Sequence, residues 1–199
     1  MNLRFLLLFF ALLFCVSLAV DLPLAIHINT HSCKELRTVC RSVSFFIAPL
    51  LHLVLWPLLT LVFWKRKAIR ENLILLTFNV LATNTLVTFL KFVVGRPRPK
   101  FFYLDGIYSP TFFSLSGNFQ SFPSRHAATI AVVAGFFAMR YPKSAPLLIS
   151  ATLLTTLARV GLNSHFLSDI VAGNLLGFSV AVMVGWVFKQ FFKEKIHES

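Results

Sequence analysis

The chain has 199 residues, a formal net charge of +12 and a mean hydropathy of +0.77. Apolar residues make up 57% of it and charged residues only 13%, whereas roughly a quarter of a typical water-soluble domain is charged. These values exclude a water-soluble globular domain and indicate an integral membrane protein. The positive charge does not indicate nucleic-acid binding, because the Lys and Arg residues form short clusters between apolar runs instead of one basic face.

Six apolar runs are long enough, or nearly so, to cross a membrane as helices, which takes roughly 17–25 mostly apolar residues. They cover residues 3–20, 43–64, 72–94, 124–140, 145–162 and 168–188. We therefore predict an all-α fold, an integral membrane six-helix bundle that forms a single domain over residues 1–199. Residues 1–42 are predicted to supply the first helix and an external loop.

The first apolar run has a second interpretation. Arg4 precedes it, as in a cleaved signal peptide. We favour a retained helix, because the segments that end at Ala19 and Ala25 are poor cleavage sites.

The basic clusters predict how the bundle is oriented. Most Lys and Arg residues between the runs fall on one side: Arg4, Lys65, Arg66, Lys67, Arg70, Arg140, Lys143, Lys189, Lys193 and Lys195. By the positive-inside rule this side is the cytoplasm. The opposite side then holds the loops 21–42, 95–123 and 163–167.

A second group of polar residues remains near the outer ends of the predicted helices. Its members are Lys91, Arg96, Arg98, Lys100, Arg125, His126, Arg159, His165 and Asp169. Ionisable residues at membrane depth cost about 2.5–3.5 kcal/mol each on insertion scales and are usually paired or functional. Any one of them alone is more typical of a satisfied surface residue. Together, at three helix ends that a bundle can bring together, they predict an anion site, and phosphate is the candidate.

The spacing around the last two helices supports this prediction. His165 and Asp169 are four residues apart and share a helix face, so Asp169 can accept the Nδ1 proton of His165. That contact fixes the tautomer and makes Nε2 a nucleophile or base. Arg159 lies six residues earlier and would face away on a continuous helix, but Gly161 and Asn163 allow the chain to turn between them.

Two further helix ends are predicted to reach the same place. Gly95, Pro97 and Pro99 end the helix that carries Lys91, which puts Arg98 on an irregular but rigid segment. The other helix end follows Pro123. Ser124 and His126 lie there in the first helical turn, where free backbone N–H groups point at an anion.

Three spaced motifs resemble the type-2 phosphatidic acid phosphatase superfamily, which also includes bacterial acid phosphatases and vanadium haloperoxidases. Residues 91–99 (KFVVGRPRP) match its Lys, six residues, Arg-Pro motif. Residues 123–126 (PSRH) match three of the four positions of Pro-Ser-Gly-His. Residues 158–169 match Ser-Arg, five residues, His, three residues, Asp, except that Ala158 replaces the leading Ser. The resemblance covers about 71–188.

The resemblance implies the catalytic residues. His165 is the expected nucleophile that forms a phosphohistidine, and Asp169 orients it. His126 is expected to protonate the leaving group and then to activate water. No Cys or His spacing is typical of a zinc site, and cations can stabilise phosphoryl transfer by charge, so we expect no metal and no cofactor.

The resemblance also implies the phosphate-binding residues. Lys91, Arg98 and Arg159 are expected to neutralise the equatorial oxygens, and Ser124 to donate a hydrogen bond. Arg125 stands where the family pattern has glycine, and its side chain could add a fourth cation for a diphosphate or a neighbouring acidic head group.

The expected function is that of a lipid phosphate phosphatase in a bacterial inner membrane, with the site facing the periplasm or exterior. Undecaprenyl diphosphate and lipid A phosphates are favoured as substrates over phosphatidylglycerophosphate and phosphatidate. The expected partners are this lipid phosphate and the surrounding membrane lipids. Alternatives are a lipid-linked phosphotransferase that uses the same site, a haloperoxidase, and a non-catalytic membrane protein such as an anion transporter.

Overall fold

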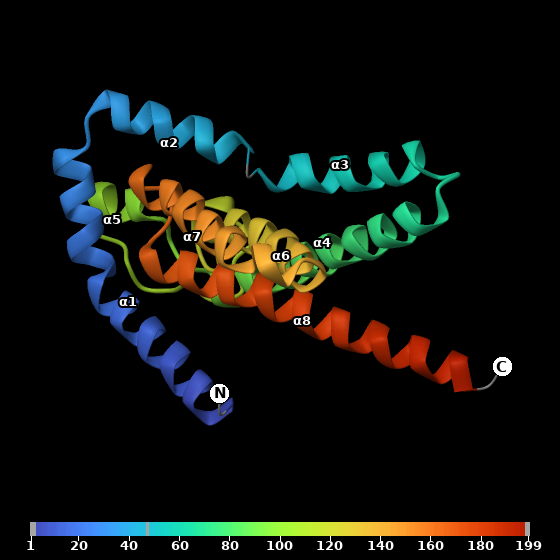
Figure 1. Cartoon of the computed structure of the whole chain (residues 1–199). Helices are drawn as coiled ribbons and strands as arrows, with labels where there is room; N and C mark the ends of the chain where they lie inside the picture. Colours follow the sequence, from blue (N-terminus) through green and yellow to red (C-terminus); the bar gives the residue numbers. More distant parts are fainter. Residues whose placement is uncertain (1–2, 47, 198–199) are drawn as a thin grey trace.

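Helices supply the regular structure of the chain (Figure 1). The computed structural model describes residues 3–46 and 48–197, with side chains for residues 10–45 and 48–188. The α-helices are α1 (Leu3–His31), α2 (Lys34–Phe46), α3 (Pro49–Val62), α4 (Lys67–Val94), α5 (Pro99–Asp105), α6 (Arg125–Arg140), α7 (Ala145–Gly161) and α8 (Leu167–His197). Two short 3₁₀ helices cover Gly117–Phe119 and Pro142–Ser144. The described residues include no strand, and the all-α prediction is confirmed.

Five stretches of the described chain are long and apolar enough to cross a membrane. They are Phe10–His31, Lys34–Val62, Lys67–Asp105, Pro142–Gly161 and Leu167–Phe188. The sixth predicted segment is α6, whose 16 residues extend for about 24 Å, less than the roughly 30 Å of a bilayer core. The predicted six-helix membrane bundle is therefore confirmed, with one short helix.

The N-terminal region differs from the prediction. We expected a helix over residues 3–20 and a loop over 21–42, but α1 continues to His31 and α2 begins at Lys34. The charge of Asp21 does not end the first helix, because this carboxylate is fully buried and paired inside the protein. The side chains of Arg4, Lys189, Lys193 and Lys195, which were used to predict the orientation, lie outside the described residues.

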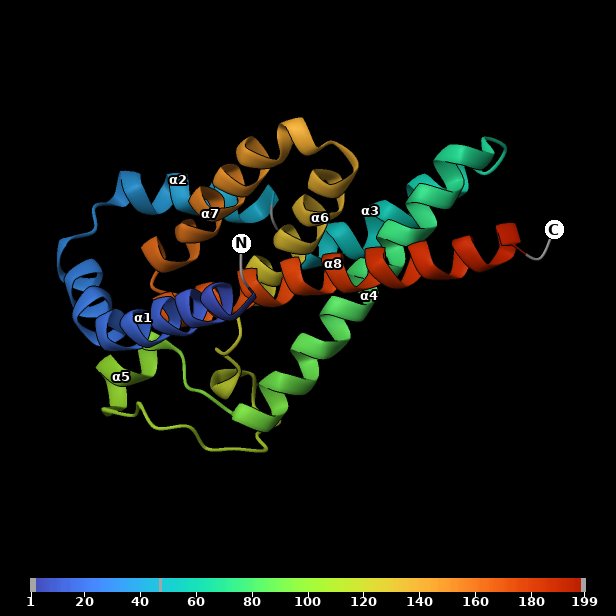
Figure 2. The same cartoon turned by 60° about the horizontal axis from the view of Figure 1, so that its bottom comes forward.

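Helix α6 lies at the centre of the bundle and packs against α4, α7 and α8 (Figure 2). Small residues allow α6 and α8 to approach closely, as in Gly-x-x-x-Gly helix pairs of membrane proteins. A Cβ atom at Gly177 would lie 2.2 Å from the backbone oxygen of Ala128, and one at Gly173 would lie 2.5 Å from that of Ser124. These contacts fix the first turn of α6 against the first turns of α8.

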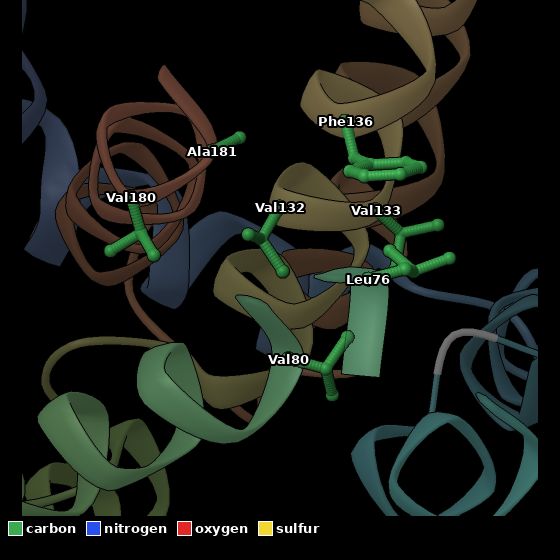
Figure 3. Packing of buried hydrophobic residues seen from close by; sticks show 7 residues of the cluster. All are labelled: Leu76, Val80, Val132, Val133, Phe136, Val180 and Ala181. Atoms are coloured by element: carbon green, nitrogen blue, oxygen red, sulfur yellow. The ribbon is translucent and has the colours of Figure 1, made fainter. Parts of the chain in front are cut away.

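An apolar cluster lies between the middle parts of α4, α6 and α8 (Figure 3). It consists of Leu76 and Val80 from α4, Val132, Val133 and Phe136 from α6, and Val180 and Ala181 from α8. Interiors of this kind are closely packed and resist displacement of one helix relative to another. The core therefore fixes the helix ends that carry the polar residues.

Candidate active site

A cavity of about 270 Å³ lies at the end of the bundle where α4 and α7 end and α6 and α8 begin. It is lined by Pro49, Leu50, Lys91, Arg98, Gln120, Arg125, His126, Arg159 and His165. Six of the eight predicted site residues are thus brought together. The other two, Asp169 and Ser124, are fully buried and do not line the cavity.

The turn after α7 brings Arg159 and His165 to the same cavity. Helix α7 ends at Gly161, and Asn163 takes a left-handed backbone conformation with φ of 54°. The backbone N–H of Ser164 donates to the Arg159 carbonyl at 3.1 Å, which closes the turn. The predicted break between the two helices is therefore present.

Asp169 contacts His165 largely through a serine that the motifs did not identify. The distance from His165 Nδ1 to Asp169 Oδ2 is 3.6 Å, too long for a good hydrogen bond. The Ser121 hydroxyl lies 3.3 Å from Nδ1 and donates to Asp169 Oδ2 at 2.6 Å. With a proton on Nδ1, the imidazole donates to Ser121, which donates to the carboxylate. Nε2 is then free of a proton on the cavity side.

Asp169 also stabilises the start of α8. Its Oδ2 accepts a hydrogen bond from the backbone N–H of Phe166 at 2.9 Å. This is one half of the capping-box arrangement, in which an acid in the first helical turn binds the N–H just before the helix. Its Oδ1 accepts from Arg96 Nη1 at 2.8 Å. Both oxygens are thus occupied, and the orientation of the carboxylate is fixed.

Lys91 and Arg98 reach the cavity from opposite sides of a tight bend. Gly95 ends α4 with a left-handed φ of 57°, and Pro99 begins α5. The Lys91 ammonium donates to the backbone carbonyls of Gln120 and Ser121, the second at 3.3 Å. The irregular segment predicted for Arg98 is present, and both Lys91 and Arg98, which are seven residues apart, line the cavity.

The first turn of α6 contributes at the cavity edge. Ser124 precedes α6, its backbone N–H donates to the Asp169 carbonyl at 2.9 Å, and its Oγ has no hydrogen-bond partner among the described residues. The Arg125 guanidinium donates from Nη2 to Thr88 Oγ1 at 3.0 Å, which holds this side chain over the rim. His126 follows on the cavity wall.

The cavity carries excess positive charge. Lys91, Arg98, Arg125 and Arg159 line it, no carboxylate does, and none of the four forms a salt bridge with a described residue. Like charges this close repel unless an anion lies between them. The arrangement therefore favours a small, multiply charged anion. Residues 3–46 and 48–197 hold no group of three or more His, Cys, Asp or Glu residues that could bind a metal ion.

Several contributors were missed at the level of sequence. Ser121 lies in a loop with several other serines, so its position gave no signal. Pro49 and Leu50 reach the cavity from the start of α3, far from any motif. Asp21 directly follows the predicted run 3–20, and only the apolar residues 22–26 after it indicate that this acid lies inside a longer helix, where it would need a partner.

The fold and the cavity define an integral membrane protein with a cationic cavity at one end of its bundle. The family model of the PAP2 superfamily matches residues 72–194, more than half of the chain. The protein therefore belongs to the PAP2 superfamily, the family of type-2 phosphatidic acid phosphatases that the three motifs resemble.

The relatives of this chain include two bacterial lipid A 1-phosphatases. It is 32% identical over 113 residues to the lipid A 1-phosphatase of Rhizobium johnstonii and 31% identical over 110 residues to that of Rhizobium etli. The alignments cover 57% and 55% of this chain and 46% and 47% of the relatives. The chain thus spans about half the length of these relatives.

The solved structure is the crystal structure of a transmembrane PAP2-type phosphatidylglycerolphosphate phosphatase from Bacillus subtilis. It matches with a TM-score of 0.57 and 21% identity, covering 96% of this chain and 95% of that one. This likeness shows a shared fold.

The protonation of His165 is testable. Residues 162–166, outside the membrane-spanning stretches, include this histidine. Burial lowers its pKa from 6.5 to about 4, and the Lys91 and Arg159 cations act in the same direction. Since the pKa is lowered, the ring stays neutral as pH falls through 6.5 and gains a proton only near pH 4. We expect ¹⁵N NMR of labelled protein, assigned with His165→Gln, to show a neutral His165 at pH 5.5. A midpoint near 6.5 would contradict this.

Proposed function

We propose that this protein is a membrane phosphatase that removes phosphate from a lipid phosphate monoester or diphosphate through a phosphohistidine on His165. The observation that carries this proposal is the position of one buried histidine. Its Nδ1 contacts Ser121, which donates a hydrogen bond to Asp169. The histidine lines a cavity whose other ionisable lining residues are four cations and His126. The membership in the PAP2 superfamily supports the same class of reaction.

In the first step, Nε2 of His165 attacks the phosphorus, and the bond between phosphorus and the leaving oxygen breaks. His126 gives that oxygen a proton. Lys91, Arg98 and Arg159 stabilise the charge on the equatorial oxygens, where most of the catalytic benefit of phosphoryl transfer arises. Ser121 and Asp169 hold the Nδ1 proton as His165 gains positive character.

In the second step, water replaces the lipid. His126, now without its proton, takes one from the attacking water, whose oxygen bonds to phosphorus as the bond to Nε2 breaks. Inorganic phosphate leaves, and both histidines return to their starting states. The same two residues thus serve both halves of the reaction, as microscopic reversibility requires.

A lipid substrate fits the asymmetric lining of the cavity. The lining combines four cations with Pro49 and the exposed apolar side chain of Leu50. A phosphate can bind the cations while the tail attached to it passes Pro49 and Leu50 into the bilayer. The names of the two Rhizobium relatives favour a lipid A phosphate, and undecaprenyl diphosphate fits the same geometry.

The proposed orientation places the cavity on the periplasmic or outer side. Helix α4 begins beside Lys67 and Arg70 and ends near the cavity, and α6 begins at the cavity and ends at Arg140. The basic clusters therefore lie at the helix ends away from the cavity. By the positive-inside rule those ends are cytoplasmic.

The nucleophile is tested by His165→Gln in purified full-length protein. We expect phosphate release from lipid A and lipid phosphate substrates to fall by about 10⁴-fold or more, since glutamine cannot form the bond to phosphorus that His165 supplies. His31→Gln, a change at an exposed histidine outside the cavity, serves as the matched control. An acid-labile phosphoprotein should form in the wild type and not in His165→Gln.

The same assay tests the rest of the proposal. Activity should persist in EDTA, because cationic side chains supply the charge. Loss of activity in EDTA, or full activity of His165→Gln, would contradict the mechanism. Absence of release from every lipid phosphate would contradict the proposed function.

Arg125 is tested by replacing it with the residue of the family pattern. We expect Arg125→Gly to raise KM for a lipid diphosphate by about tenfold, the value of one charge-assisted hydrogen bond, and to change KM for the monophosphate by less than about twofold, as judged from that same value. Arg125→Lys should retain most of the affinity. Equal losses with both substrates would show that Arg125 does not contact the second phosphate.

A further inference from the structure

A second ionic network lies behind the cavity, and it begins in the first helix. Asp21 is the acidic residue of α1, and its side chain has no exposure to solvent. A carboxylate in such a place is stable only if it is paired and hydrogen-bonded. Helix α1 lies outside the part of the chain that matches the PAP2 family model, residues 72–194. The family motifs therefore do not account for this carboxylate.

Asp21 binds Arg96 and the start of α8. Its Oδ2 accepts from Arg96 Nη2 at 2.8 Å and from the Ser168 hydroxyl at 2.5 Å. Its Oδ1 accepts from the backbone N–H of Ser168 at 2.9 Å. That N–H belongs to the first turn of α8, where helix N–H groups have no partner within the helix and favour an anion.

Arg96 joins the two carboxylates. Nη1 donates to Asp169 Oδ1 at 2.8 Å, while Nη2 binds Asp21. The guanidinium carbon also lies 4.5 Å from the centre of the Phe166 ring and 5.5 Å from that of Tyr108, two rings whose centres are 5.4 Å apart. Although Arg96 lies between Lys91 and Arg98 in sequence, it does not line the cavity. The bend at Gly95 turns it to the other side.

We propose that Asp21 and Arg96 are positioning residues for His165, acting through Asp169. This inference rests on the proposed function. Arg96 occupies Oδ1 of Asp169, so that Oδ2 is the oxygen that faces Ser121 and the imidazole. Asp21 holds Arg96 in that place. Without Asp21, the guanidinium loses the partner that holds Nη2, so that it can leave Oδ1 and free the Asp169 carboxylate to rotate.

A purely structural function is the alternative, in which the network only attaches α1 to α8. The two interpretations predict different kinetics. A positioning function lowers kcat and leaves KM nearly unchanged, because the phosphate-binding cations are untouched. A structural function lowers thermal stability and leaves the kcat of the folded fraction unchanged.

The first test is Asp21→Asn in the full-length protein in detergent. We expect kcat for phosphate release to fall by about 10- to 100-fold, the usual loss when a catalytic group is misplaced by about 1 Å. We expect KM to change by less than about twofold, because the residues that bind the phosphate are unchanged. Asp21→Glu should recover part of the rate. Asn174→Ala is the matched control, because Asn174 is a buried α8 residue that donates to Thr156 and has no hydrogen bond to Asp169, Arg96 or Asp21 among the described residues. It should lose stability without loss of kcat.

The second test asks whether Asp21 acts through Arg96. If it does, the double variant Asp21→Asn with Arg96→Gln should be no slower than Arg96→Gln alone. Independent effects would multiply instead. If Asp21→Asn does not yield folded protein, Arg96→Lys gives the same comparison, because lysine keeps the charge but cannot bind both carboxylates through a fixed fork.

The third test does not depend on turnover. ¹⁵N NMR should show the Nδ1–H tautomer of His165 in the wild type and a smaller fraction of it in Asp21→Asn and Arg96→Gln. Wild-type kcat and tautomer in both variants would overturn the inference, as would a kcat loss matched by Asn174→Ala. If the wild-type protein releases no phosphate from any lipid phosphate, the proposed function is contradicted. The tautomer measurement would still decide whether Asp21 and Arg96 position His165.

Discussion

The buried carboxylate of Asp169 connects the segments that meet at the end of the bundle that holds the cavity. Its side chain accepts hydrogen bonds from Ser121 in the loop before α6, from the Phe166 backbone before α8, and from Arg96 after α4. Its backbone carbonyl accepts from Ser124. Breaking a buried, paired charge of this kind typically costs about 3–5 kcal/mol. The position of His165 therefore depends on the same contacts that hold three helix ends together.

The cations near Asp169 divide into two groups with different surroundings. Arg96 is paired with carboxylates and does not line the cavity, while Lys91 and Arg98, from the same nine-residue segment, face it without a carboxylate partner among the described residues. This separation keeps Asp169 from neutralising the cavity. The cavity can then remain cationic and bind an anion, while the Asp169 carboxylate forms its salt bridge with Arg96.

Much of the fold and the site could be predicted because both are encoded locally. Apolar runs of membrane length identify helices without any tertiary information, and the bends at Gly95 and Gly161 follow from residues that end helices. Three motifs then place their side chains at helix ends, which a bundle brings together. Six of the eight predicted residues line one cavity for that reason.

The remaining features depend on contacts between distant segments. Asp21 and Arg96 are 75 residues apart, and Ser121 and Asp169 are 48 apart. No spacing rule connects such pairs. The extent of α1 was underestimated for a related reason: a charge at residue 21 resembles the end of a membrane helix unless its buried partner is known. Residues 34–42 were assigned to the external loop because their mixed composition resembles a loop, whereas α2 covers Lys34–Phe46.

A structure of the protein with bound orthovanadate tests the proposed chemistry most directly, because vanadate adopts the five-coordinate geometry of phosphoryl transfer. We expect vanadium bonded to Nε2 of His165, its equatorial oxygens on Lys91, Arg98 and Arg159, and its free apical oxygen facing His126. Vanadate in the cavity without a bond to His165, or bound only elsewhere on the protein, would contradict a phosphohistidine mechanism at this site.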